Sequence, residues 1–178
     1  MIYEEGCYYH LYNRGCNKEL IFQKENDYQK LIQIIKESKI YEYLEIYAFS
    51  LMPNHYHFFI KQISSKPVTN WIKYVFNRYV KKYNIKYDRK GTLFESNVKV
   101  KFIDKLDYLG NITHYIHNNP TSDFLKKYSS LNYLEKDTFV NLNFFNEFFG
   151  GITHYLEQFE EYKKSVDNKK IEDYLFGK

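Results

Sequence analysis

The stretch YLEIYAFSLMPNHYHFFIKQI, residues 43–63, contains two runs rich in aromatic and β-branched residues, separated by Pro53-Asn54. Such runs favour strands, and a short turn-forming dipeptide between them is typical of a hairpin. In a strand, residues i and i+2 point to the same face of the sheet. His55 and His57 are therefore expected to present two imidazoles on one face.

The rest of the chain surrounds this hairpin with further strands and amphipathic helices. Hydrophobic periodicity and turn residues predict the following elements. They are a strand at 7–13, a helix at 25–41, strands at 43–52 and 55–63, a helix at 67–84, a strand or extended loop at 91–104, a helix at 104–120, and helical stretches near 142–149 and 152–164. This order predicts an α+β fold, a ferredoxin-like or RRM-like antiparallel sheet with helices packed on it. Many functions use such a sheet, so the fold does not choose among them.

The cysteines and the apolar runs indicate the compartment. Cys7 and Cys16 lack the spacing of a zinc site, which favours free thiols in a reducing environment. The beginning of the sequence has no basic and apolar signal pattern, and no apolar run approaches the roughly 18 residues that a membrane span needs. We therefore expect a cytoplasmic protein without a membrane partner.

Positive charge is concentrated between residues 73 and 90, which hold seven Lys or Arg residues and one acid. Tyrosine and phenylalanine alternate with these cations. Lysines that neutralise phosphates and rings that stack on bases suit single-stranded nucleic acid. The same pattern also fits a solvated helix face over a tyrosine-rich core, and this segment alone favours that second interpretation.

The pair His55 and His57 is a candidate metal site. Imidazole binds many divalent metals, and a site with two histidines leaves positions open for a substrate oxygen. Two unrelated histidines at the start of a strand are the alternative, and the His-x-His pattern is weakly specific when it stands alone.

Three motifs in order make the pattern far more specific: YYHLYNRGCNKELIF at 8–22, LMPNHYHFFI at 51–60 and THYIHNNP at 113–120. Together they resemble the HUH single-tyrosine (IS200-like) transposases, within them the REP-associated tyrosine transposases. The resemblance runs from about residue 9 to about residue 150. It implies the HUH endonuclease fold, with a catalytic domain at 1–125 and a helical C-terminal extension at 126–178.

The resemblance also assigns roles to individual residues. The catalytic tyrosine of the family precedes the Asn of the final motif by four residues, which is Tyr115 here. Its attack on a DNA phosphodiester would give a 5′-phosphotyrosine and a free 3′-hydroxyl. His55 and His57 would hold Mg²⁺ or Mn²⁺, and Asn119 would be the third protein ligand through its side-chain oxygen.

Helical spacing supports this assignment independently. Tyr115 and Asn119 are an i,i+4 pair on one face of the 104–120 helix. That face is offset from the apolar stripe, so Tyr115 is predicted to face an exposed site. His114 and His117 lie on other faces and are left out. The apolar stripe consists of Leu106, Leu109, Ile112 and Ile116.

The resembled enzymes act on single-stranded DNA that carries small hairpins, and five cations are candidates for contacting it. They are Arg14, Lys73, Arg78, Lys81 and Lys82. Arg14 is also open to interpretation as a loop ion pair. Glu95 is expected to be a structural or capping acid, and His10 a core or hydrogen-bonded histidine.

Two other functions stay open from the sequence. One is a catalytically silent, RRM-like nucleic-acid reader. The other is a metal-dependent phosphoesterase in which water, not tyrosine, attacks the phosphate. If the protein is a transposase, it could serve a mobile element or act as a domesticated enzyme on genomic hairpins. The sequence also leaves open whether it works as a monomer or as a homodimer.

Overall fold

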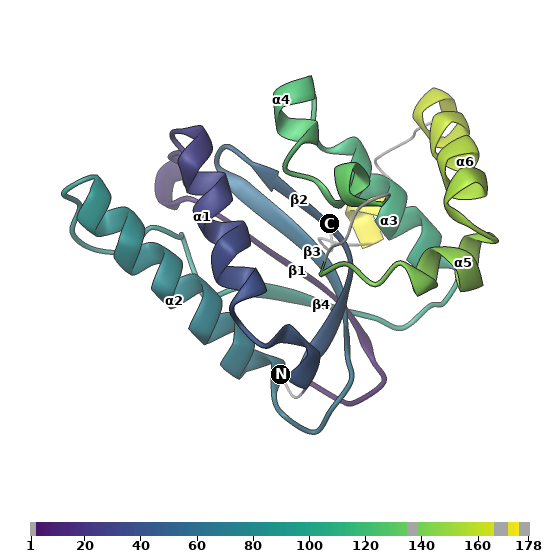
Figure 1. The fold of residues 1–178 in the computed structure, drawn as a ribbon, viewed down its shortest axis with the longest axis horizontal. Coiled ribbons are helices and arrows are strands. Elements are labelled where there is room, and N and C mark those ends of the chain that lie inside the picture. Colours follow the sequence, from purple (N-terminus) through teal and green to yellow (C-terminus); the bar gives the residue numbers. More distant parts are fainter. Residues whose placement is uncertain (1–2, 135–138, 166–170, 175–178) are drawn as a thin grey trace.

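A four-stranded antiparallel sheet lies at the centre of the protein (Figure 1). The computed structural model describes residues 3–134, 139–165 and 171–174. The sheet has the order β2-β3-β1-β4. Its strands are β1 (Tyr8–Arg14), β2 (Leu44–Met52), β3 (His55–Gln62) and β4 (Lys99–Ile103). This arrangement confirms the predicted α+β class.

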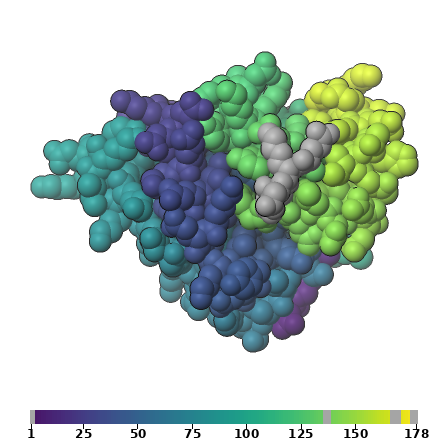
Figure 2. Space-filling model, viewed as in Figure 1, coloured from purple at the N-terminus to yellow at the C-terminus, as the bar shows by residue number. Residues whose placement is uncertain are grey.

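Helices cover both faces of the sheet. Helices α1 (Glu25–Lys36) and α2 (Val68–Lys86) pack together over one face. Helix α3 (Tyr108–Asn118) contacts β2 and β3 from the other face. Along the sequence follow α4 (Asp123–Lys126), α5 (Asn143–Phe149) and α6 (Ile152–Ser165), and 3-10 turns η1 (Cys16–Lys18), η2 (Ile40–Glu42) and η3 (Ser130–Tyr133). In the space-filling view α2 and the α4–α6 region lie on opposite sides of α1 (Figure 2).

Strand alternation decides which side chains meet each helix layer. Tyr56 points to the α2 layer, where its ring stacks on Phe76 at a centroid distance of 4.5 Å. His57 points the opposite way, to the α3 layer, where its ring lies 5.8 Å from that of Tyr115. The predicted separation of the two sheet faces within the His-Tyr-His stretch is therefore confirmed.

The register of the sheet aligns residues that are far apart in sequence. Strand β1 pairs antiparallel with β3, so that Arg14 lies opposite His55 and Tyr12 opposite His57. On its other side β1 pairs with β4, so that Tyr12 also lies opposite Lys99. Directly opposed residues on neighbouring strands share a face. Cations and histidines thus gather on one end of one face.

Two predicted helices are longer in the sequence analysis than in the structure. Helix α1 ends at Lys36, and Lys39 adopts a left-handed conformation with φ of 49°, which a right-handed helix cannot include. Helix α3 begins at Tyr108, so Leu106 precedes it and is 65% exposed. Leu106 was wrongly placed in the buried stripe. None of the helices in the described ranges has the length and apolar character that a membrane crossing requires.

Asp27 joins the start of α1 to the end of α2. Its side chain accepts hydrogen bonds from the backbone N–H groups of Gln23 and Lys24, both at 2.9 Å. It also accepts from the hydroxyl of Tyr87 at 2.7 Å and from Nζ of Lys86 at 2.5 Å. Burial on its own raises the pKa of the Asp27 carboxyl, but these donors together outweigh burial and the pKa is lowered. The ionised form is therefore the stabilising one.

We expect Asp27→Asn to lower the free energy of unfolding at pH 7 by about 3 kcal/mol, because an amide group would face donors that need an acceptor. A carboxyl with a lowered folded-state pKa stabilises above its unfolded value of about 3.9 and loses this effect as the pH falls through the folded-state pKa. Urea unfolding at pH 7 and pH 3 should therefore show the difference between the two proteins narrowing at pH 3. As a control, Asp123→Asn removes an exposed ion pair with Lys126 and should leave both unfolding curves unchanged. If Asp27→Asn lowers the free energy of unfolding equally at pH 7 and pH 3, the expectation is contradicted.

Candidate functional site

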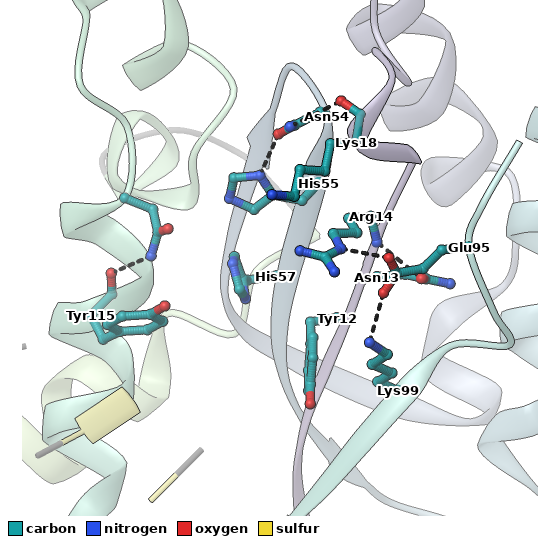
Figure 3. Close-up of a pocket in the computed structure, with 11 residues that line it drawn as sticks. Tyr12, Asn13, Arg14, Lys18, Asn54, His55, His57, Glu95, Lys99 and Tyr115 are labelled. Carbon is teal, nitrogen blue, oxygen red and sulfur yellow. Dashed lines mark hydrogen bonds and ion pairs between the residues drawn. The ribbon is translucent and has the colours of Figure 1, made fainter. Parts of the chain in front are cut away.

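A pocket of about 570 Å³ opens on the face of the sheet that carries His57 (Figure 3). Five of the nine site residues predicted from the sequence line it. They are Arg14, His55, His57, Tyr115 and Asn119. They come from β1, β3 and the end of α3, which the fold brings together from three distant parts of the chain.

The two histidines are oriented by hydrogen bonds at Nδ1. His55 Nδ1 donates to the side-chain oxygen of Asn54 at 2.7 Å. His57 Nδ1 shares a hydrogen bond of 2.9 Å with Nε2 of His10, which confirms His10 as a buried, hydrogen-bonded histidine. The His55 and His57 rings lie 5.2 Å apart and almost perpendicular. Because Nδ1 is engaged in each ring, Nε2 is the nitrogen that each can offer to a ligand.

Both imidazoles are kept in the neutral form. Burial lowers the pKa of His57 well below its usual value, and the neighbouring rings of His10 and His55 add to this effect. Burial also lowers the pKa of His55, where a hydrogen bond to Asn119 opposes the effect and the charge of Arg14 adds to it. A neutral imidazole has the lone pair that a metal ion requires.

Tyr115 lines the pocket beside His57 but is largely buried, with an exposed fraction of 8%. Its ring meets that of His57 nearly edge to face, at 5.8 Å. Burial raises the pKa of Tyr115 to about 12, with a further contribution from Glu172, while a hydrogen bond from Asn119 opposes the rise. Tyr115 therefore faces the pocket while most of its side chain is buried, because this face of α3 turns toward the sheet.

Asn119 follows the last residue of α3 and is half-buried. Its side-chain N–H group donates to the carbonyl oxygen of Tyr115 at 2.8 Å, which fixes the amide and turns its oxygen away from that carbonyl. Two neutral imidazoles and an amide oxygen form a donor set that suits a divalent ion. Within the described ranges, no group of three or more His, Cys, Asp or Glu side chains could hold a metal. Three protein ligands at this site therefore require the amide.

Several pocket residues were missed or undervalued in the sequence. Tyr12 could have been found, because it alternates with His10 and Arg14 along β1. Lys18 lies within the first of the three motifs but no role was assigned to it, and Lys99 gave no signal, since it belongs to none of them. Glu95, expected to be a structural acid, also lines the pocket and bonds to two of its cations.

The basic helix lies away from this pocket. Lys73, Arg78, Lys81 and Lys82 belong to α2, on the face of the sheet opposite α3 (Figure 1). The rings of Phe76, Tyr79 and Tyr83 are buried, with exposed fractions of 4%, 2% and 2%. These three rings pack in the core and are not available for stacking on bases. The burial of these rings fits the solvated face over a tyrosine-rich core, while contact of the four cations with DNA stays a prediction.

His114 and His117 face the C-terminal helices. His117 Nε2 shares a hydrogen bond of 2.5 Å with the Ser130 hydroxyl, and its Nδ1 bonds to the hydroxyl of Tyr155. The His114 ring packs against those of Tyr155 and Tyr162. Neither histidine lines the pocket, in agreement with their omission from the predicted site.

Comparisons with known proteins point in one direction. The family model described as "Transposase IS200 like" matches residues 3–119. The fold is similar to a solved REP-associated tyrosine transposase bound to a REP hairpin, with 16% identity, a TM-score of 0.54, and coverage of 74% of this chain and 81% of that one. A crystal structure from Deinococcus radiodurans R1, described as a candidate transposase, matches with 16% identity and a TM-score of 0.45, over 67% of this chain and 95% of that one. No curated protein matches the sequence.

Proposed function

The chain belongs to the IS200-like transposase family, and from this premise we propose that it cuts and rejoins single-stranded DNA with Tyr115 as the nucleophile. The observation that carries the proposal is the position of the Tyr115 ring, 5.8 Å from the His57 ring in a pocket shared with His55 and Asn119. A tyrosine, an oriented histidine pair and an amide in one pocket are the parts that a covalent phosphodiester transfer needs.

In the proposed reaction the Tyr115 oxygen forms a bond to phosphorus while the bond from phosphorus to the 3′ oxygen breaks. The phenol loses its proton and the departing oxygen gains one, so that a 5′-phosphotyrosine and a 3′-hydroxyl result. The phosphotyrosine retains the energy of the phosphodiester, so attack by a 3′-hydroxyl can rejoin DNA. His55, His57 and Asn119 would hold Mg²⁺ or Mn²⁺, which supplies positive charge that polarises a phosphate oxygen.

Single-stranded DNA bearing a hairpin is the proposed substrate. A related fold has been solved with a REP hairpin, which supports this class of ligand. Arg14, Lys18 and Lys99 line the pocket and can neutralise phosphates near the cut. Lys73, Arg78, Lys81 and Lys82 would contact DNA that passes the opposite face, through charge alone.

Contacts also support a proposed division of the chain into a catalytic domain at 1–125 and an extension at 126–178. Helix α6 of the extension packs on α3 where Tyr155 meets His114 and His117, which do not line the pocket, while Glu172 of the extension lies close enough to Tyr115 to raise its pKa. The histidine pair and Tyr115 lie together within one chain, which supports a site completed in cis.

A two-step assay tests the function. The Tyr115→Phe protein first selects hairpin oligonucleotides from a library with random stems and flanks, since selection by binding requires no cleavage. The wild-type protein is then incubated with the selected oligonucleotide, labelled at either end, and Mn²⁺. We expect a denaturation-resistant adduct on the 5′ end of the downstream fragment. Cleavage without an adduct would identify a phosphoesterase, and binding without cleavage would identify a nucleic-acid reader.

The rate of adduct formation should depend on pH through the Tyr115 phenol. Because burial raises its pKa to about 12, only a small fraction is ionised at neutral pH. We expect the single-turnover rate to rise by about tenfold per pH unit between roughly pH 6.5 and 8.5, as the phenolate fraction does. Replacement of Tyr115 by 3-fluorotyrosine, a more acidic phenol, should move the profile to lower pH. A rate that is independent of pH would show that ionisation of this phenol does not limit the attack.

A further inference from the structure

Three charged side chains form an ion cluster on the pocket wall beyond the histidine pair. Glu95 accepts from Nε of Arg14 at 2.5 Å and from Nζ of Lys99 at 2.7 Å. In Figure 3, Arg14 lies between the histidines and Glu95, on the side of His57 away from Tyr115. The charge of Arg14 contributes, after burial, to the lowered pKa of His55. The cluster is therefore electrostatically coupled to the histidine site.

Glu95 is fixed beside Arg14 by the backbone as well as by its side chain. The N–H group of Glu95 donates to the carbonyl oxygen of Arg14 at 3.0 Å. Directly before it, Gly15 and Phe94 form an antiparallel bridge. The carboxylate thus starts from a fixed backbone position, unlike the partner in a flexible surface ion pair.

The geometry leaves the phosphate-binding end of Arg14 directed at the pocket. Arg14 donates a hydrogen bond to Glu95 through its Nε only. Its terminal amino groups make no hydrogen bond to any residue that the structure describes. Those two groups form the planar fork that matches phosphate oxygens. The side chains of Arg14 and Lys99 are 49% and 43% exposed, so a bound DNA strand can contact both.

We propose that Glu95 is a positioning residue that aims Arg14 and Lys99 at the DNA backbone phosphate next to the one attacked by Tyr115. This inference rests on the proposed function, because it takes single-stranded DNA as the ligand of the pocket. The attacked phosphate must lie between Tyr115 and the histidines. A DNA strand that crosses the pocket then places the next phosphate of its backbone at the ion cluster, on the far side of the histidines.

Glu95 does not fit the role of a metal ligand. Its Oε2 is bonded to Arg14 and its Oε1 to Lys99, so both carboxylate oxygens already contact cations. A divalent ion at either oxygen would have to displace a positive side chain. A phosphate, in contrast, binds the outward donors of Arg14 without breaking its bond to Glu95.

The test measures binding of the Tyr115→Phe protein to the selected hairpin oligonucleotide, with one phosphate at a time replaced by neutral methylphosphonate. In this parent protein we expect one flanking phosphate whose replacement weakens binding about tenfold. Arg14→Met should abolish the effect of that single replacement. In Glu95→Ala the same replacement should weaken binding by less than about threefold, because the Arg14 side chain is no longer held in position. Glu95→Gln should restore part of the effect, since an amide oxygen also accepts from Nε.

Glu42→Ala is a matched control. Glu42 pairs with Lys66 at 2.5 Å and Lys39 at 3.7 Å and its side chain is 27% exposed, against 21% for Glu95, yet it does not line the pocket. Its methylphosphonate profile should equal that of the parent. A parent-like profile for Glu95→Ala overturns the proposal, as does a loss of Mn²⁺ affinity above about tenfold, which would make Glu95 a ligand.

This scan is independent of cleavage. If the wild-type protein never forms an adduct but the scan gives the expected pattern, the Tyr115 mechanism is rejected and the positioning role of Glu95 stands. If the Tyr115→Phe protein retains no oligonucleotide from the library, both proposals fail together.

Discussion

Tyr115→Phe should abolish the covalent protein–DNA adduct and reduce strand cleavage by more than about 10³-fold, because phenylalanine has no oxygen to bond to phosphorus. The ring that packs beside His57 is retained, so the pocket keeps its shape. Removal of the hydroxyl costs one hydrogen bond, and we expect a change of about 1 kcal/mol in the free energy of unfolding. Affinity for the hairpin should remain within a few-fold of wild type.

The matched control is Tyr128→Phe. Tyr128 is similarly buried, with an exposed fraction of 5%, and loses a hydroxyl that donates to Glu25 at 2.7 Å. It does not line the pocket, so adduct formation should be unchanged. Adduct formation by Tyr115→Phe would show that another tyrosine is the nucleophile. Peptide mapping of the adduct would identify that tyrosine.

His57→Gln should weaken Mn²⁺ binding by more than about 100-fold and abolish cleavage. The substitution removes the imidazole Nε2, and the remaining ligands would be His55 and Asn119. Isothermal titration of the protein with Mn²⁺ measures this without reference to activity. Treatment of the wild-type protein with a chelator should likewise stop cleavage, and added Mn²⁺ should restore it.

His114→Gln controls for the loss of a buried histidine. Its exposed fraction is 7%, against 5% for His57, and its ring faces Tyr155 and Tyr162. Mn²⁺ affinity should be unchanged in this variant even if the protein is less stable. Equal Mn²⁺ affinity in His57→Gln and wild type would instead remove His57 from the metal site and reject this half of the proposed mechanism.

The local parts of the site could be predicted from the sequence. Alternation along a strand placed His55 and His57 on one face, and helical spacing paired Tyr115 with Asn119. These inferences depend only on periodicities of two and 3.6 residues, which the backbone imposes wherever such segments form. The motif order then indicated that the two parts meet, and in the structure both parts line one pocket.

The remaining site depends on long-range packing. Lys99 lies opposite Tyr12 because of the register with which β4 pairs with β1. The sequence predicted only a strand or extended loop somewhere within 91–104, and such wide bounds do not determine a register. The basic helix was ambiguous for a related reason. Its rings and cations alternate so closely that only packing against the sheet decided which of them point inward.

The central position of β1 affects how the site comes into being during synthesis. Strand β1 pairs with β3, where His10 meets His57 at a separation of 47 residues, and with β4, where Tyr12 meets Lys99. Such non-local pairing gives the chain a high contact order, which slows folding. A nascent chain that has passed β3 but not α3 holds both histidines and lacks Tyr115. We therefore expect the ability to cut DNA to appear only after α3 has been synthesised and has packed on the sheet, so that shorter nascent chains are inactive.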